Sequence, residues 1–457
     1  FFFFLTAKPH KSEQGRVFIM SISLITFNRY NKNYKFEINF DGGTMTSNSG
    51  ISLIGEFISR IGLPEVISTL FSGYCNNRKF GDDQIIMQKI LQCIAGYYTD
   101  DAADYLANDP MLTRVCHMEK LASQPTLSRF NSRASNLKII DAESVLKYLR
   151  DVAYSLKPQS RVIMDIDTTI LPTYGSQDGG EYVYHYDAVG YHPILCYDGL
   201  TGDILRSELR DGNTYCGKDS HTFVKPLLEE YKERNMHVTV RGDSGFAMPE
   251  LYDMVESYDN ADYVIRVKKN TTLANKLHDE LEALKQTGKS TSKIGEFMYK
   301  AKSWEKERRI VYKLDVNADG QQELFASYMF IVTNVSAEPK EVIKLYCKRG
   351  NMENFIKECK NEFGFRYMSS TNRLANELRL QIDSIAYAVL NLFRRICLPK
   401  TWIKYRANEL RLRIMRIAGR VVRTSGKVIF KLCEHYPYKE DFIKIYNNIC
   451  LINIINR

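Results

Sequence analysis

The sequence predicts an α/β protein: a mixed sheet with flanking helices, a β-rich insertion, and a mainly helical N-terminal region. Three observations support this fold class. Apolar residues recur with helical spacing from Ile51 to about Asn136. From Ser160 onward, short β-branched runs alternate with helical segments. Between residues 270 and 328 the chain turns polar but stays strand-like.

Length and composition limit the class of protein further. The 457 residues are 44% apolar and 26% charged, which suits a folded chain of several structural units. A net charge of +9 favours a polyanionic partner. The 10 cysteines show no metal-binding spacing and resemble the reduced thiols of a cytoplasmic protein. No apolar run is long enough to span a membrane, so no membrane partner is expected.

The N-terminal segment differs from the rest of the chain. "FFFFLTAKPHKSEQGRVFIM" begins without Met and lacks the basic region of a signal peptide. We interpret residues 1–19 as read-through upstream of Met20, and predict that residues 1–35 are a disordered or non-native leader. Residues 36–158 form the mainly helical region. Within it, "LASQPTLSRFNSRAS" predicts a helix with Arg129 and Arg133 on one face, which suits a recognition helix and a plain packing helix equally.

The central part of the chain predicts the sheet. Its segments are a strand, a hairpin, a helix, a strand, a helix and a strand, an order that suggests a mixed sheet covered by helices. We expect residues 159–269 to form the first part of this core and residues 270–328 to be the insertion. Residues 329–395 complete the core with a further helix. The segments are "RVIMDIDTTIL", "HPILCYDGLTGDILRSEL", "KDSHTFVKPLLEEYKERN", "HVTVRGDSG", "PELYDMVESY" and "DYVIRVKK".

Residues 396–457 form a basic C-terminal region. From Arg394 to Lys431 the chain holds twelve Lys and Arg residues and a single acid, Glu409. A solvated face is the usual explanation of a charge run, but this excess favours a surface that meets phosphates. "RVVRTSGKVIFKL" predicts a hairpin with a three-residue Thr-Ser-Gly loop.

Acidic residues follow two of the predicted buried strands. Asp165 and Asp167 come after Val-Ile-Met, and Asp243 follows "VTVRG". Buried carboxylates are costly unless they are paired or bind a metal ion, and sites form where strands of open α/β sheets end. For Asp243 alone, a turn aspartate is the competing interpretation. Alternation along the strand does not separate Asp165 from Asp167, because residues i and i+2 share a face.

A third acid lies in the segment "YCKRGNMENFIKECK". In one continuous helix, Tyr346, Arg349, Glu353 and Lys360 would fall on a single narrow stripe. Taken alone, this stripe is a solvated face with an Arg349–Glu353 ion pair. Taken with the two aspartates, Glu353 completes a set of oxygen donors that suits two Mg²⁺ or Mn²⁺ ions, and the bases are placed to grip phosphates.

The spacing Tyr346-x2-Arg349-x3-Glu353-x6-Lys360 resembles the Tyr-Arg-Glu-Lys signature of DDE transposases from bacterial insertion sequences. "FDGGTMTSNSGISLIGEF", "LASQPTLSRF" and "YCKRGNMENFIKE" resemble the subgroup called DDE domain group 1. The resemblance runs from Phe36 into the basic tail and implies an RNase H-like core. It also implies that the catalytic, metal-binding acids are Asp167, Asp243 and Glu353, where Asp167 is favoured over Asp165 because Thr168-Thr169 follow it.

The resemblance further implies DNA contacts. In related transposases an aromatic residue of the insertion stacks on a flipped base, a role that Trp304 would fill unless it is a core residue. Residues 36–158 would be a DNA-binding region. The expected DNA-binding residues are Tyr346, Arg349, Lys357, Lys360, Trp304, Arg129 and Arg133.

The function implied is that of an insertion-sequence transposase in the bacterial cytoplasm, associated with the nucleoid. It would bind terminal inverted repeats and target DNA as a homodimer in a synaptic complex. It would cut and join strands with two Mg²⁺ ions, for which Mn²⁺ can substitute. Two alternatives stay open: an RNase H-like nuclease without strand transfer, and a catalytically defective DNA-binding remnant or repressor.

Overall fold

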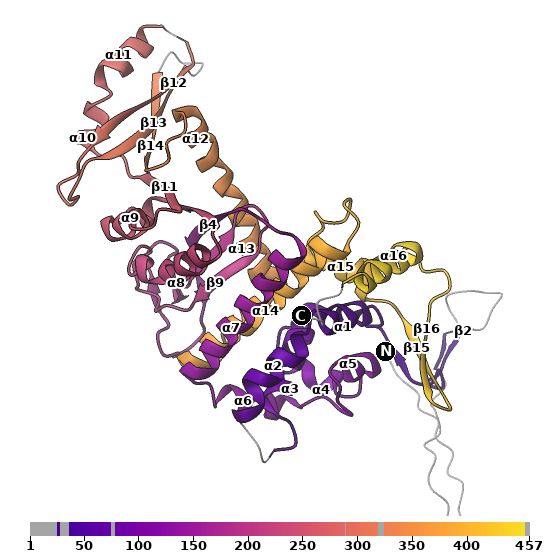
Figure 1. The fold of residues 1–457 in the computed structure, drawn as a ribbon. Helices are drawn as coiled ribbons and strands as arrows, with labels where there is room; N and C mark the ends of the chain where they lie inside the picture. Colours follow the sequence, from indigo (N-terminus) through magenta and orange to yellow (C-terminus); the bar gives the residue numbers. More distant parts are fainter. Residues whose placement is uncertain (1–24, 28–35, 75–77, 288, 319–323, 453–457) are drawn as a thin grey trace, which may run out of the picture.

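The computed structural model describes residues 25–27, 36–74, 78–287, 289–318 and 324–452 (Figure 1). Most of the predicted leader, residues 1–35, lies outside this part of the chain. The described strands are β1 (Ile25–Phe27), β2 (Phe36–Ile38), β3 (Met45–Thr46), β4 (Arg161–Thr168), β5 (Leu171–Pro172), β6 (Glu181–Val183), β7 (Ala188–Tyr191), β8 (Ile194–Asp198), β9 (Ile204–Glu208), β10 (His237–Gly242), β11 (Ala261–Val267), β12 (Thr291–Tyr299), β13 (Arg308–Ala318), β14 (Leu324–Thr333), β15 (Gly419–Thr424) and β16 (Lys427–Leu432).

The principal sheet has eight strands in the order β12-β13-β14-β11-β10-β4-β8-β9. β4, β8 and β9 form an antiparallel meander, whereas β10 and β11 run parallel to β4. The order β9-β8-β4-β10-β11 is that of an RNase H-like fold, so the predicted mixed sheet is confirmed. β4 is buried over most of its length because helices cover both of its faces.

Helices make up most of the remaining described chain. None of them has both the length and the apolar run that crossing a bilayer would require. They are α1 (Ile51–Arg60), α2 (Leu63–Phe71), α3 (Asp82–Ala95), α4 (Ala102–Leu106), α5 (Pro110–Val115), α6 (Gln124–Asn131), α7 (Asn136–Leu156), α8 (Ser220–Glu233), α9 (Pro249–Glu256), α10 (Thr271–Asn275), α11 (His278–Gln286), α12 (Pro339–Cys347), α13 (Asn351–Glu362), α14 (Arg373–Cys397), α15 (Ala407–Leu410) and α16 (Lys439–Cys450).

The two faces of the sheet have different cores. On one face, α8 and α9 connect successive strands and bury side chains such as Leu228 and Leu251 against Met164 and Val240. On the other face, α13 and α14 pack over β8 and β9, and α12 packs over β11, β13 and β14. Burial of apolar surface on both faces stabilises the strand ends where the predicted acids lie.

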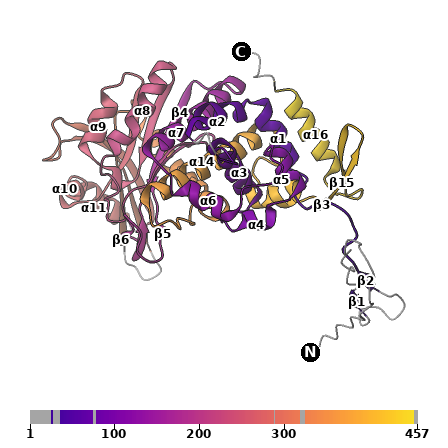
Figure 2. The same ribbon diagram turned by 90° about the horizontal axis from the view of Figure 1, so that it is seen from below.

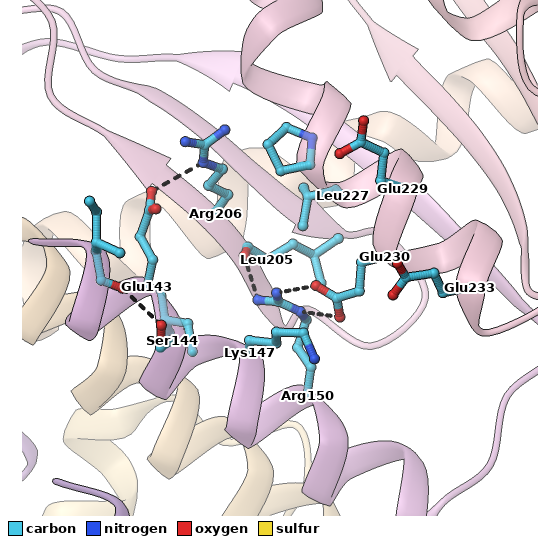
Figure 3. Close-up of a pocket in the computed structure, with 13 residues that line it drawn as sticks. Glu143, Ser144, Lys147, Arg150, Leu205, Arg206, Leu227, Glu229, Glu230 and Glu233 are labelled. Atoms are coloured by element: carbon cyan, nitrogen blue, oxygen red, sulfur yellow. Dashed lines mark hydrogen bonds and ion pairs between the residues drawn. The ribbon is translucent and has the colours of Figure 1, made fainter. Parts of the chain in front are cut away.

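The N-terminal region is mainly helical, as predicted, and shares its core with α14. One continuous hydrophobic cluster extends from α1 through α7 to α13, α14 and α16. A buried ion pair also joins the two regions: Arg150 on α7 lies 2.6 Å from Glu230 on α8 (Figure 3). Arg150 donates a further hydrogen bond of 2.8 Å to the carbonyl of Leu205 on β9, so α7 is fixed to the sheet by polar contacts as well.

The insertion extends the principal sheet. Its strands form antiparallel pairs, and β14 also pairs with β11, where Val264 lies opposite Thr333. Two helices, α10 and α11, open the insertion, although its strand-like sequence pattern predicted strands throughout. Figure 1 shows the insertion at the end of the sheet away from the N-terminal helices.

The predicted C-terminal hairpin is present as β15 and β16, with β3 added at one edge. The predicted three-residue loop is wrong. Thr424 pairs with Lys427, which leaves a two-residue turn in which Gly426 has φ of +78°. This conformation suits glycine because it has no Cβ.

Candidate active site

Asp167 and Asp243 lie at the ends of adjacent strands. β4 and β10 are parallel and in register, with Asp165 opposite Arg241, so the residues that follow reach the same edge of the sheet. Both aspartates line one cavity of about 400 Å³. Asp167 accepts a hydrogen bond of 2.8 Å from the Thr168 amide, and Asp243 accepts one of 2.8 Å from the Gly245 amide. Each aspartate therefore keeps a second carboxylate oxygen free of these bonds.

Asp165 has different surroundings from Asp167. It is 0% exposed, and both of its carboxylate oxygens accept hydrogen bonds of 2.6 Å from the Arg241 guanidinium. Arg241 is itself buried and donates a third bond of 2.6 Å to the carbonyl of Leu345 on α12. This ion pair joins β4, β10 and α12, and it occupies the Asp165 carboxylate fully.

Asp167 lies among other acids. The pKa of Asp167 is raised to about 6, chiefly by burial and to a smaller extent by the carboxylates of Asp243 and Glu353. The guanidinium of Arg349, whose Nη2 lies 2.8 Å from Asp167 Oδ2, opposes this shift. Since like charges raise the cost of ionising Asp167, the cluster favours an added cation.

The segment that carries Arg349 is not one helix, contrary to the prediction. α12 ends at Cys347, a 3₁₀ turn spans Lys348–Gly350, and α13 begins at Asn351. Gly350 is a poor helix former, and the change in turn geometry breaks the uniform spacing on which the predicted stripe depends. Arg349 consequently pairs with Asp167 rather than with Glu353. Its Nε is buried without a hydrogen-bond partner among the described residues.

The other residues of the predicted stripe differ in their exposure to solvent. Glu353 and Lys357 on α13 are exposed and lie 3.9 Å apart. Lys360 donates a hydrogen bond of 3.0 Å to Thr169, and burial lowers the pKa of Lys360 to about 8. Tyr346 lies on α12, is 8% exposed and packs in the hydrophobic cluster between this helix and the sheet.

Three predicted DNA contacts lie away from the aspartate cavity. Trp304 is 6% exposed and packs edge-on against Tyr252 and Tyr299, as a core residue does. Arg129 and Arg133 lie on α6, where they line a different cavity. Arg133 also pairs with the buried Asp82 at 2.6 Å.

The basic C-terminal region is less exposed than its charge predicts. Arg394 pairs with Glu358 at 2.6 Å, and Arg411 is buried and donates to backbone carbonyls such as Ile94. The hairpin β15–β16 does present cations to solvent: Arg420, Arg423, Lys427 and Lys431.

Several residues that line the cavity were not singled out from the sequence. Tyr184, Tyr186, Tyr215 and Lys268 surround the aspartates. The aromatic-rich run "GGEYVYHYDAVGY" is a sequence signal for Tyr184 and Tyr186, whereas Tyr215 and Lys268 lie outside it. His192 also lines the cavity: its Nδ1 lies 2.8 Å from the Thr214 carbonyl oxygen, and burial lowers its pKa.

The family model described as "Transposase DDE domain group 1" matches residues 28–453. The chain belongs to this family. The match confirms the resemblance found in the sequence and makes the protein a member of a transposase family. No curated protein matches the chain.

Two solved transposases are similar in structure to this family member. A piggyBac transposase, solved as a synaptic complex with hairpin DNA, is 13% identical over 75% of each chain with a TM-score of 0.36. A Mos1 transposase, solved as a paired-end complex with the left transposon end, is 12% identical over 42% of this chain and 70% of that chain, with a TM-score of 0.16.

Members of the DDE family generally use divalent metal ions. Within the part of the chain that the structure describes, no three His, Cys, Asp or Glu side chains are grouped to hold a metal ion. The donor chemistry nevertheless fits Mg²⁺, because Asp167 and Asp243 offer carboxylate oxygens in one cavity. The Glu353 carboxylate is near enough to contribute to the raised pKa of Asp167.

The ion pair of Asp165 predicts a loss of stability on substitution. Asp165→Asn leaves the Arg241 guanidinium buried without a counter-charge and should cost about 3–5 kcal/mol in the free energy of unfolding. Thermal and urea unfolding would measure this loss. Asp167→Asn is the matched control on the same strand, and it should cost much less because Asp167 is partly exposed and is costly to ionise. Equal losses in the two variants would refute the structural role of Asp165.

Proposed function

We propose that this family member is an insertion-sequence transposase whose catalytic acids are Asp167, Asp243 and Glu353. The observation that supports this most strongly is the meeting of Asp167 and Asp243, from separate strands, in one cavity beside Arg349. A lone turn aspartate does not account for this arrangement, because Asp167 and Asp243 both face the Arg349 guanidinium, and the Glu353 carboxylate also acts on Asp167.

The acids would hold divalent metal. Asp167, Asp243 and Glu353 are the residues that would bind Mg²⁺ or Mn²⁺. When bound, a metal pair of this kind activates a water or a 3′-hydroxyl and stabilises the leaving oxygen of a phosphodiester. Asp165 is committed to Arg241 and would take no direct part.

The cations near the acids would hold the DNA backbone. Arg349 has a buried Nε without a hydrogen-bond partner among the described residues, which suits a phosphate oxygen. Lys360 is fixed beside the end of β4 through Thr169, and Lys357 extends from α13 into solvent. The exposed cations of the β15–β16 hairpin would add contacts that do not depend on DNA sequence.

The substrate would be the DNA on either side of the gene. We propose that the protein binds the terminal inverted repeats, cuts to release 3′-hydroxyl ends and joins them to target DNA. A homodimer in a synaptic complex would supply one set of acids for each transposon end.

Substitution of the three acids should reduce DNA cleavage without reducing DNA binding. In a plasmid that carries the gene with its flanking DNA, Asp167→Asn, Asp243→Asn and Glu353→Gln should each lower strand cleavage by at least about 100-fold. DNA binding, measured by gel shift, should persist or tighten because negative charge next to phosphate is removed. Cleavage at the normal rate in all three variants would refute the catalytic assignment. Cleavage by the unaltered protein without joining to a target plasmid would mark a nuclease rather than a transposase.

The backbone contacts should show in the salt dependence of binding. Arg349→Ala and Lys360→Ala should each reduce the slope of log affinity against log salt by about one and weaken binding to all sequences alike. Lys225→Ala, which removes an exposed cation from α8, is the matched control and should leave the slope unchanged. An effect confined to one base position would show instead that these residues read sequence.

A further inference from the structure

A groove between α7 and α8 has no part in the function proposed above (Figure 3). The two helices form its walls, β9 forms its floor, and its volume is about 340 Å³. It shares no lining residue with the aspartate cavity. α8 also lies toward the opposite end of the molecule from β15, a strand of the cationic hairpin (Figure 2). DNA held at the acids and at this hairpin would therefore leave the groove free.

The floor of the groove is neutralised by two ion pairs. Arg150 pairs with Glu230 at 2.6 Å, and Arg206 on β9 pairs with Glu143 at 3.2 Å. Arg206 also donates a hydrogen bond of 2.7 Å to the carbonyl of Phe223 on α8. The earlier residues of α7 are thus linked to the first half of α8 and the later ones to its second half. The two helices consequently run in the same direction along the groove.

The rims of the groove carry opposite charges at the end lined by the later residues of both helices. α7 presents Lys147, and α8 presents Glu229 and Glu233. Lys147 lies 3.5 Å from Asp151, and Glu229 lies 3.9 Å from Lys225. Exposed pairs of this kind contribute little to stability, so these charges can pair with others at little cost.

The charge of Glu233 has no use within the chain. Glu233 is the last residue of α8, where a negative charge opposes the helix dipole. Among the residues that the structure describes, no cation forms an ion pair with it, whereas Glu229 and Glu230 on the same helix are both paired. Its carboxylate is therefore open to a cation from another molecule.

The end of the groove lined by the earlier residues of both helices is apolar. Ile140 on α7 is 55% exposed, and Pro226 on α8 is exposed as well. Leu137, about one turn before Ile140, is 64% exposed. Apolar side chains left in solvent beside a groove are typical of a surface that meets another protein.

We propose that two copies of the chain pair through this groove, and that they do so before either copy binds DNA. This pairing goes beyond the proposed function, which calls for two copies at the transposon ends but for no particular surface between them. A two-fold axis parallel to the groove places α7 of each copy opposite α8 of the other. Lys147 then faces Glu233 of the partner subunit, and the two apolar ends meet. A two-fold axis across the groove would instead place the charged end against the apolar end.

Charge favours a second copy as the occupant. The chain has a net charge of +9, so two copies repel one another over most of their surface. The groove supplies both an acidic and a basic rim, and a two-fold interface requires such self-complementary charges. DNA does not suit the acidic rim, because Glu229 and Glu233 would repel its phosphates.

Sedimentation velocity of the full chain in EDTA and without DNA, over a series of concentrations, measures the pairing. The unaltered chain should form a dimer. Glu233→Lys and Lys147→Glu should each raise the Kd of the dimer at least about tenfold, because like charges then face one another across the axis. The double variant should recover most of this loss, because each lysine again faces a glutamate. Glu341→Lys, which reverses an exposed charge on α12, is the matched control and should leave the Kd unchanged.

The apolar end has its own variant. Ile140→Ser should also raise the Kd of the dimer, because apolar surface is no longer buried between the copies. Ile443→Ser, which changes an isoleucine that is 50% exposed on α16, is the matched control. Thermal unfolding of every variant checks that these exposed substitutions leave the fold intact.

Three outcomes would overturn the proposed pairing. One is a chain that stays monomeric at all concentrations without DNA, and another is a dimer that the groove variants leave unchanged. The third is a double variant that pairs as weakly as the single variants, because the two charges would then not face one another. None of these results decides whether the unaltered protein cuts DNA, so the proposed function is tested separately by the variants of the three acids.

Discussion

The buried ion pair between Asp165 and Arg241 is the contact on which the site depends. It joins the two central parallel strands, and the third bond of Arg241 reaches the last turn of α12. The strand ends and the turn that carries Arg349 are thereby fixed relative to one another. Breaking this buried pair would leave one charge without a counter-charge away from water. Because this is costly in free energy, the pair holds the two strands and α12 in one arrangement.

β4 carries two carboxylates that have different roles, Asp165 and Asp167. Asp165 and Asp167 share a face of β4, yet one is matched by a bidentate guanidinium and the other faces a cavity with further acids. Burial, with a smaller contribution from the neighbouring carboxylates, raises the pKa of Asp167 to about 6, although Arg349 opposes this shift. A divalent cation would therefore stabilise the carboxylates of this cavity more than it would stabilise Asp165, which already has a counter-charge.

The sequence predicted the parts of this fold that local pattern determines. Strand alternation and β-branched runs located β4, β8–β11 and the C-terminal hairpin. It did not predict the break at Lys348–Gly350, because one glycine is compatible with either outcome. It also missed contacts between distant residues: Arg241 lies 76 positions from Asp165, and the burial of Trp304 and Arg411 depends on partners in other elements. Packing among such elements has no local sequence signal.

Anomalous diffraction from crystals soaked in Mn²⁺ tests the central claim, that Asp167 and not Asp165 joins Asp243 in the metal site. The account predicts Mn²⁺ peaks at the carboxylates of Asp167 and Asp243, with Arg349 moved away from Asp167 and the Asp165–Arg241 pair intact. A peak on Asp165 with Arg241 displaced, or no Mn²⁺ at either strand end, would contradict it.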